Sequence, residues 1–140
     1  MNEYRLVYVS KRQEKLATAD IKSIIQTAEE KNKSDHISGI LLYSNRSFLQ
    51  VLEGDLIKIN QTFKRICQDP RHSEILLLSL NPIEHRFFSD WFMLLFNVDT
   101  IQNLDAALFD SSEKSLYHPF PLSGELAIEI GLLAKYYAKK

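Results

Sequence analysis

Cysteine, glycine and proline are all scarce in this sequence of 140 residues. The single cysteine, Cys67, excludes an internal disulfide framework. The four glycines are too scattered to build a phosphate-binding loop or a dinucleotide fingerprint. The four histidines and the cysteine also lack the spacing of metal ligands. We therefore expect a protein that is not an enzyme and that holds no metal ion.

The chain also lacks an excess of charge of one sign and any long apolar run. Its 17 basic and 18 acidic residues give a formal net charge of -1, so we expect no nucleic-acid partner. The longest apolar runs, around Ile75–Leu80 and Phe92–Phe96, have the length of strands and not of membrane spans. The first residues contain no signal-peptide core, which predicts a cytoplasmic protein without a membrane segment.

Apolar residues predict seven elements in the first hundred residues. Tyr4–Ser10 is apolar on both faces, as is typical of a central strand. A helix with Thr18 as N-cap should follow, because apolar residues recur at i, i+3, i+4 and i+7. These residues are Ile21, Ile24, Ile25 and Ala28.

The next elements are a predicted hairpin, a helix and two strands. Ser38–Tyr43 and Phe48–Leu52 should pair, and Gly54 should end the second of these strands. Asp55 is expected to cap a second helix, which Pro70 stops. The last two strands are predicted at Ile75–Leu80 and Trp91–Val98.

The order of these elements predicts an α+β fold, a ferredoxin-like sandwich with a five-stranded sheet and two helices on one face. We expect this domain to occupy residues 1–98 and a helical extension to occupy residues 99–140. The extension should hold a short helix near Leu104–Phe109 and a last helix at Ser123–Ala138.

The last helix is apolar on two sides. One side comprises Leu126, Ile130, Leu133 and Tyr137, and the other comprises Ile128, Leu132 and Tyr136. Such a helix usually has two surfaces to pack against. We expect one to be the sheet face that carries Phe92, Leu94 and Phe96, and the other to belong to a second copy or a partner protein.

Several polar residues interrupt this apolar framework. Gln50 lies within an apolar strand, and an amide buried there without partners would cost about 1–3 kcal/mol. Taken singly, Gln50 is compatible with an exposed edge, Tyr8 with an ordinary core tyrosine and Asn32 with a helix cap. Likewise, Trp91 and Met93 could be core residues, and the cluster of Arg65, Arg71 and His72 a solvated helix end.

Together these residues form a pattern that resembles the BLUF family of flavin-binding blue-light sensor domains. Leu6–Ser10 resembles its first strand, Ile37–Tyr43 its I-[TS]-G-[LIM]-L-x-Y motif and Phe48–Gly54 its F-[LV]-Q-x-[LI]-E-G motif. Asp69–His72 matches D-x-R-H, and Trp91–Met93 is similar to W-S-M. The likeness covers about residues 4–97, which is typical of the short single-domain members.

The resemblance implies a non-covalently bound FAD between the two helices, and with it a role for each matching residue. Tyr8 would donate an electron and a proton to the photoexcited flavin, and Gln50 would change its hydrogen bonding to give a red-shifted signalling state. Asn32 would bond the C4=O/N3 edge of the flavin, and Lys31 would lie near its C2=O edge.

Further residues would hold the cofactor or report its state. Ile24 and Ile66 would sandwich the ring. The residues on the ribityl-phosphate side would be Arg65, Arg71 and His72, supported by Asp69. Trp91 and Met93 would report the state of Gln50 to the sheet.

Two positions depart from the family pattern, and two other functions share the predicted fold. Lys31 replaces the usual Asn or His, and Phe92 replaces a small serine, which affects the output route more than flavin binding. An RNA-recognition module would need a basic surround that is absent here. A regulatory domain that binds another small molecule, without photochemistry, is the remaining alternative. Whether the domain binds a flavin or another small molecule, its signal should pass to an unidentified partner protein or a homo-oligomer.

Overall fold

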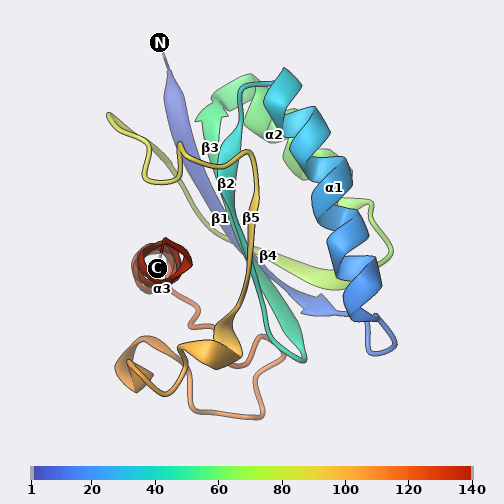
Figure 1. Ribbon diagram of the computed structural model, residues 1–140, viewed down its shortest axis with the longest axis vertical. Coiled ribbons are helices and arrows are strands. Elements are labelled where there is room, and N and C mark those ends of the chain that lie inside the picture. The colour runs from blue at the N-terminus through green and yellow to red at the C-terminus, as the bar shows by residue number, and fades with distance from the viewer. Residues whose placement is uncertain (1, 140) are drawn as a thin grey trace.

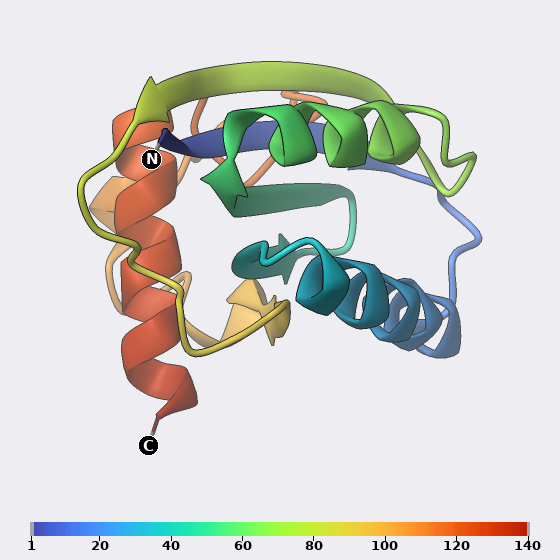
Figure 2. The same ribbon diagram turned by 90° about the horizontal axis from the view of Figure 1, so that it is seen from above.

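A five-stranded sheet separates two helical layers in the computed structural model, which describes residues 2–139 (Figures 1 and 2). Residue 1, where the predicted domain 1–98 begins, and residue 140, where the predicted extension 99–140 ends, lie outside the described part. Helices α1 (Thr18–Ser34) and α2 (Leu56–Cys67) cover one face, and α3 (Gly124–Ala138) crosses the other. None of the helices described is both long and apolar enough to cross a membrane.

The sheet has the strand order β4-β1-β3-β2-β5. The strands are β1 (Glu3–Arg12), β2 (Ser38–Tyr43), β3 (Ser47–Asp55), β4 (His72–Pro82) and β5 (Leu94–Asn97). All neighbours are antiparallel except β2 and β5, which run parallel. This arrangement confirms the predicted ferredoxin-like α+β fold with a fifth strand.

The helix ends follow local hydrogen bonding. Asp55 caps α2 as predicted, because its carboxylate accepts from the N–H groups of Ile57 (3.1 Å) and Lys58 (3.2 Å). The prediction for α1 was wrong by one residue: Ala17 is the N-cap, and its N–H donates to the Asp20 carboxylate at 2.9 Å. The first turn of α1 is thus held by an acidic side chain three residues on, which also suits the helix dipole.

The observed strands β1 and β4 are longer at both ends than predicted, and two further differences in the strand boundaries bear on the site. Gly54 does not end the third strand, which continues to Asp55 because Glu3 and Tyr4 of β1 still pair with it. The predicted strand Trp91–Val98 shortens to β5, and the stretch before it follows an irregular path. Two carbonyls there bind other elements, since Trp91 O accepts from Gly39 N–H (3.1 Å) and Phe92 O from Asn32 Nδ2 (2.8 Å).

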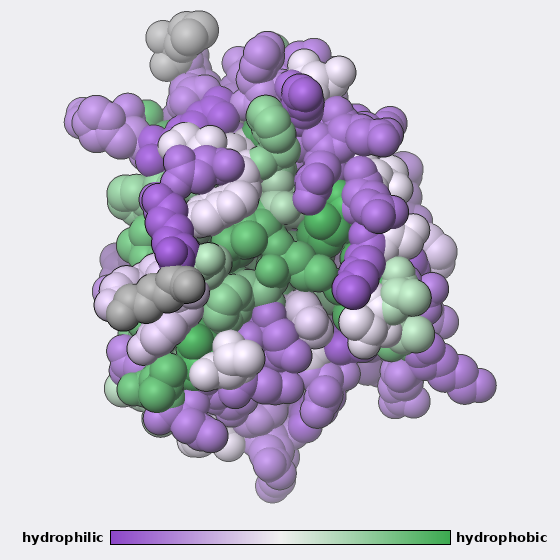
Figure 3. Space-filling model, viewed as in Figure 1, coloured by the Kyte–Doolittle hydropathy of each residue, from purple (hydrophilic) through white to green (hydrophobic). Residues whose placement is uncertain are grey.

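Phe92 does not pack on the far sheet face as predicted, because its side chain is 43% exposed. Leu94 and Phe96 do pack there, half-buried against the residues of the α3 layer. An apolar patch lies over β5, between α1 and the end of α3, and hydrophilic side chains flank it (Figure 3). The edge of the sheet at β5 therefore presents apolar side chains at the surface.

Helix α3 packs mainly through small residues, and of the predicted stripe Leu126, Ile130, Leu133 and Tyr137 only Ile130 is fully buried. Its fully buried residues are Ala127, Ile130, Gly131 and Ala134. A Cβ on Gly131 would lie 2.9 Å from Cζ of Phe88, which is closer than such atoms approach in proteins. Small residues let the helix backbone come close to the core, and the larger side chains at its edges stay partly exposed.

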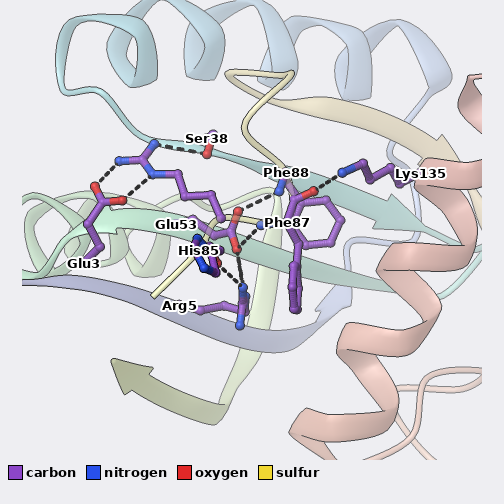
Figure 4. A network of polar contacts seen from close by, with 9 residues as sticks. Glu3, Arg5, Ser38, Glu53, His85, Phe87, Phe88 and Lys135 are labelled. Carbon is purple, nitrogen blue, oxygen red and sulfur yellow. Dashed lines mark hydrogen bonds and ion pairs between the residues drawn. The ribbon is translucent and has the colours of Figure 1, made fainter. Parts of the chain in front are cut away.

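A buried ion pair ties the sheet to the loop between β4 and β5 (Figure 4). The Glu53 side chain is 0% exposed and accepts from Arg5 Nε at 2.8 Å. It also accepts from the backbone N–H groups of Phe87 (3.0 Å) and Phe88 (2.8 Å). The Arg5 guanidinium lies 4.0 Å from the centre of the Phe87 ring and donates to the carbonyl of His85 at 3.2 Å.

Glu53→Ala should lower the free energy of unfolding by about 3–5 kcal/mol, because it leaves the Arg5 charge and two backbone N–H groups buried without their acceptor. Urea denaturation of the purified variants measures this loss. The control is Glu3→Gln, which removes a partly exposed carboxylate that pairs with Arg86 and should cost about 1 kcal/mol or less. Equal losses in the two variants would contradict the role assigned to Glu53.

Candidate functional site: a cavity between the two helices

A cavity opens between α1 and α2 and reaches the sheet. Its volume is about 190 Å³. The cavity brings together ten residues that the sequence singled out for cofactor binding. They are Tyr8, Ile24, Lys31, Asn32, Gln50, Arg65, Ile66, Asp69, Arg71 and His72.

A tyrosine and a glutamine form the inner end of the cavity. Tyr8 on β1 lies directly opposite Gln50 on β3, and both side chains are almost fully buried. The Tyr8 hydroxyl donates to Gln50 Oε1 at 2.5 Å, and Gln50 Nε2 donates to the Met93 sulfur at 3.3 Å. Both ends of the amide are thus engaged, which explains how a glutamine can occupy an apolar strand.

Burial raises the pKa of Tyr8 far above its ordinary value of 10.0, and Cys67 and Asp69 add to the shift. The phenol therefore keeps its proton at neutral pH and acts as a hydrogen-bond donor. Phe63 and His72 surround the ring, with ring centroids 5.6 and 6.1 Å from that of Tyr8. This setting fixes the direction of the hydroxyl towards Gln50.

Asn32 connects the cavity to the segment before β5. Its side chain is 2% exposed, and its Nδ2 donates to the Phe92 carbonyl at 2.8 Å. Taken singly, Asn32 was compatible with a helix cap, but the C-cap of α1 is Asp35. The amide oxygen of Asn32 is left to face the cavity or water.

The side walls of the cavity are mainly apolar, and the sequence analysis identified only some of the residues that form them. Ile24 of α1 and Ile66 of α2 were expected to flank a ring. Five further residues line the cavity: Thr27, Ala28, Leu41, Phe48 and Thr62. Their spacing carries a signal, since Leu41 pairs with Gln50 across the sheet and Phe48 lies two residues before it on the same face.

The outer end of the cavity is cationic, but its side chains differ in how many of their N–H groups already bond to other groups of the protein. Arg71 donates from Nε and Nη2 to the Asp69 carboxylate at 2.6–3.1 Å, which lowers the pKa of Asp69 and raises that of Arg71. His72 is held by Ser10 Oγ at Nδ1 and by the Ile66 carbonyl at Nε2, each at 2.7 Å. A carbonyl only accepts, so Nε2 of His72 carries a proton.

Met93 and Trp91 lie in different places. Met93 is 3% exposed and contacts Gln50. Trp91 is half-buried and does not line the cavity; Lys139 at the end of α3 lies 5.7 Å from its ring centre. The structure thus brings Met93, but not Trp91, to the photoactive group that the sequence predicted.

The raised pKa of Tyr8 predicts a loss of stability in alkali. Above pH 10 the unfolded chain loses the Tyr8 proton while the folded chain keeps it, so the free energy of unfolding falls as pH rises. Tyr8→Phe should reduce this slope by up to about 1.4 kcal/mol per pH unit. Urea denaturation between pH 9 and about 11.5 tests it, with Tyr137→Phe at an exposed position as the control. An unchanged slope in Tyr8→Phe would contradict the burial argument.

Comparison with known proteins places this chain and its fold in a family. The model of the BLUF family, sensors of blue-light using FAD, matches residues 4–94. Photoactivated adenylate cyclase subunit beta of Euglena gracilis is 33% identical over 87 residues, which are 61% of this chain and 10% of that protein. The blue light- and temperature-regulated antirepressor BluF of Escherichia coli (strain K12) is 31% identical over 107 residues, 75% of this chain and 27% of that protein.

A solved structure extends the likeness beyond the matched region. The dark state of BlrB, a BLUF protein, superposes with a TM-score of 0.78 at 30% identity and covers 99% of this chain and 96% of that one. By contrast, this chain spans about a tenth of the length of the cyclase subunit that it matches. The family match covers well over half of the chain and confirms the resemblance seen in the sequence: the chain belongs to the BLUF family of blue-light sensors that use FAD.

Proposed function

We propose that this protein is a blue-light photoreceptor that holds FAD non-covalently in the cavity between α1 and α2. The observation that carries the proposal is the buried chain Tyr8–Gln50–Met93 at the inner end of that cavity. A metabolite-binding regulatory domain would need a cavity, but it would have no need of a phenol and an amide bonded in series at its end.

The residues present fit a flavin. Apolar walls on both helices suit the faces of a flat ring, and Ile24 and Ile66 would contact them. Asn32 and Gln50 present amides at the inner end, where the polar edge of the ring would need hydrogen bonds. The cationic mouth suits a phosphate group, and Arg65 is the cation there with most donors available.

When bound, the flavin supplies the absorption of blue light and accepts an electron and a proton; the protein supplies orientation. Tyr8 would give up both and then take both back, so that nothing is consumed, and its phenolic proton already points at Gln50 Oε1. Gln50 then changes which end of its amide faces Tyr8. This reversal breaks the Nε2–Met93 contact, and it needs no charged group in the protein interior.

Blue light should shift the absorption of the purified yellow protein reversibly to longer wavelength. Tyr8→Phe and Gln50→Leu should each keep bound flavin and lose this red shift, because one lacks the proton and electron donor and the other the reversible amide. Absorption spectra before and after illumination measure both results. Thr27→Ser is the control: it removes one methyl group from a residue in the cavity wall, keeps the hydroxyl, and should behave as the parent.

A colourless, folded protein after expression with riboflavin would overturn the flavin proposal in favour of another small ligand. A normal red shift in Gln50→Leu would overturn the role of Gln50 alone.

We further propose that the signal leaves through the loop between β4 and β5 and through α3, towards a partner protein or a second copy, with no reaction catalysed. Several contacts support this route. Met93 and Phe92 touch the cavity residues, while Lys135 of α3 donates to the Phe87 carbonyl and Lys139 pairs with Asp90 at 2.6 Å. The loop therefore contacts the cavity at one end and the last helix at the other.

The outer side of α3 offers a surface for such a partner. Tyr136 is 51% exposed and Tyr137 37% exposed. Both line a groove that also includes Leu132 and Leu133 of α3 and Leu108 of the short helix Ala106–Leu108. Exposed aromatic residues beside an apolar groove are typical of protein interfaces.

Lys139→Met should keep the flavin photocycle but reduce the light-dependent change in hydrogen exchange of α3, because it breaks the contacts to Asp90 and Trp91. Hydrogen exchange of dark and illuminated protein, read by mass spectrometry, measures the difference. Lys114→Met removes an exposed lysine outside α3 and should leave the change intact. An equal light response in Lys139→Met would exclude this route.

A further inference from the structure

Three cations and three anions surround the mouth of the cavity. Lys31, Arg65 and Arg71 line the cavity together with Asp69. A second, open basin adjoins it, and Lys31 and Arg65 line both. The basin adds two carboxylates, Glu30 and Asp35. Any anionic group that enters the mouth must therefore compete with carboxylates that the protein itself provides.

Arg71 is the cation least open to such a group. Its Nε and Nη2 donate to the Asp69 carboxylate at 2.6–3.1 Å, in the geometry of a two-point ion pair. The Asp69 carboxylate also accepts from the backbone N–H of Arg71 at 2.9 Å. This pair is short, local and largely complete without any ligand.

Arg65 is held more loosely, and its partner comes from the opposite helix. Its Nη2 donates to Thr62 Oγ1 at 3.2 Å and lies 3.7 Å from Oδ2 of Asp35, the C-cap of α1. The other oxygen of Asp35 lies 3.7 Å from Nζ of Lys58. One carboxylate thus faces two cations of α2 across the cleft, and neither contact is short enough for a hydrogen bond.

We propose that Asp35 is an internal counter-ion that competes with the phosphate of a bound flavin for Arg65, and so sets how strongly the cleft prefers phosphorylated flavins to riboflavin. The inference rests on the proposed flavin function. A phosphate monoester carries nearly two negative charges near neutral pH, so it displaces a carboxylate from a cation more readily than a neutral ribityl chain does. Asp35 acts through Arg65 and is a positioning residue.

The arrangement has a physical consequence for the two cations of α2. Without an anion from α1, Arg65 and Lys58 would face one another along α2 with no opposing charge. Asp35 supplies that opposing charge to both, and a phosphate that binds Arg65 would compete with it. Lys31 remains available on the same rim, since no ion pair of this lysine is found within residues 2–139.

The test is an exchange experiment on the flavin-loaded protein. Each variant is equilibrated with equal concentrations of riboflavin and FMN, and the ratio of the two flavins bound is measured after removal of free ligand. This ratio does not depend on the overall stability of the fold, because both ligands bind the same folded protein. Asp35→Asn should raise the FMN-to-riboflavin ratio about two- to fivefold.

Two further variants separate the Asp35–Arg65 contact from the general effect of negative charge in the basin. Glu30→Gln removes a carboxylate from the same basin, but one that has no ion pair among the described residues, and should raise the ratio by clearly less than Asp35→Asn. In an Arg65→Gln background, Asp35→Asn should have little effect on the ratio, because the cation for which Asp35 and the phosphate compete is no longer there. High salt should shrink the effect of Asp35→Asn.

An unchanged ratio in Asp35→Asn would overturn the proposal, as would an equal rise in Glu30→Gln or a full rise that persists in the Arg65→Gln background. A parent protein that holds none of the three flavins, riboflavin, FMN or FAD, would instead overturn the flavin function itself. The two failures are therefore distinguishable.

Discussion

The pairing of β1 with β3 positions the polar groups of both sheet faces at once. One register sets Tyr8 opposite Gln50 and Arg5 opposite Glu53. Residues three apart on a strand point to opposite faces, so the first pair faces the cavity between α1 and α2 and the second faces the side of α3. A slip of one residue would exchange the faces and bury each pair among the wrong partners. The register is thus a requirement for the cavity and for the loop contacts together.

The loop between β4 and β5 depends on the second of these pairs. Glu53 binds two successive backbone N–H groups of the loop, and Phe88 beside them fills the space over Gly131 of α3. Further along, the same loop delivers Met93 to Gln50. A change at Gln50 therefore acts on a segment whose other end is rigidly attached. Under the proposed route, a shift at Met93 would reach α3, because the fixed end of the loop leaves few other ways to accommodate the movement.

Sequence patterns marked Gln50 because it stands out against an apolar strand, whereas Asn32 lies in a polar stretch at a helix end and was compatible with a cap. The family resemblance related both residues to the cavity in which the structure brings them together. The patterns failed where long-range contacts decide the path of the chain. Trp91–Met93 has strand-like apolar character, yet Gly39 and Asn32 capture its carbonyls and hold it outside the ladder.

The packing of α3 shows a second kind of limit. Large apolar residues suggested which side faces the sheet, but the buried stripe consists mainly of alanine and glycine. A pattern based on hydrophobicity gives small residues little weight, although they are what allows close approach of a helix. The loose contact of Asp35 with Arg65 was equally invisible in the sequence, because residues 30 positions apart give no sign that their two helices meet across a cleft.

The polarity of the cavity is graded from its inner end to its mouth, and this gradient follows from the cost of burying charge. The inner end uses only uncharged donors and acceptors: a phenol, two amides and a thioether. A charged group at that depth would need a permanent partner, and a permanent partner would oppose any reversal of hydrogen bonding. The ionic groups lie at the mouth, where water screens them and where they can exchange partners at little cost. A neutral interior therefore permits a reversible change around Gln50, while the charged rim is free to bind the anionic part of a ligand.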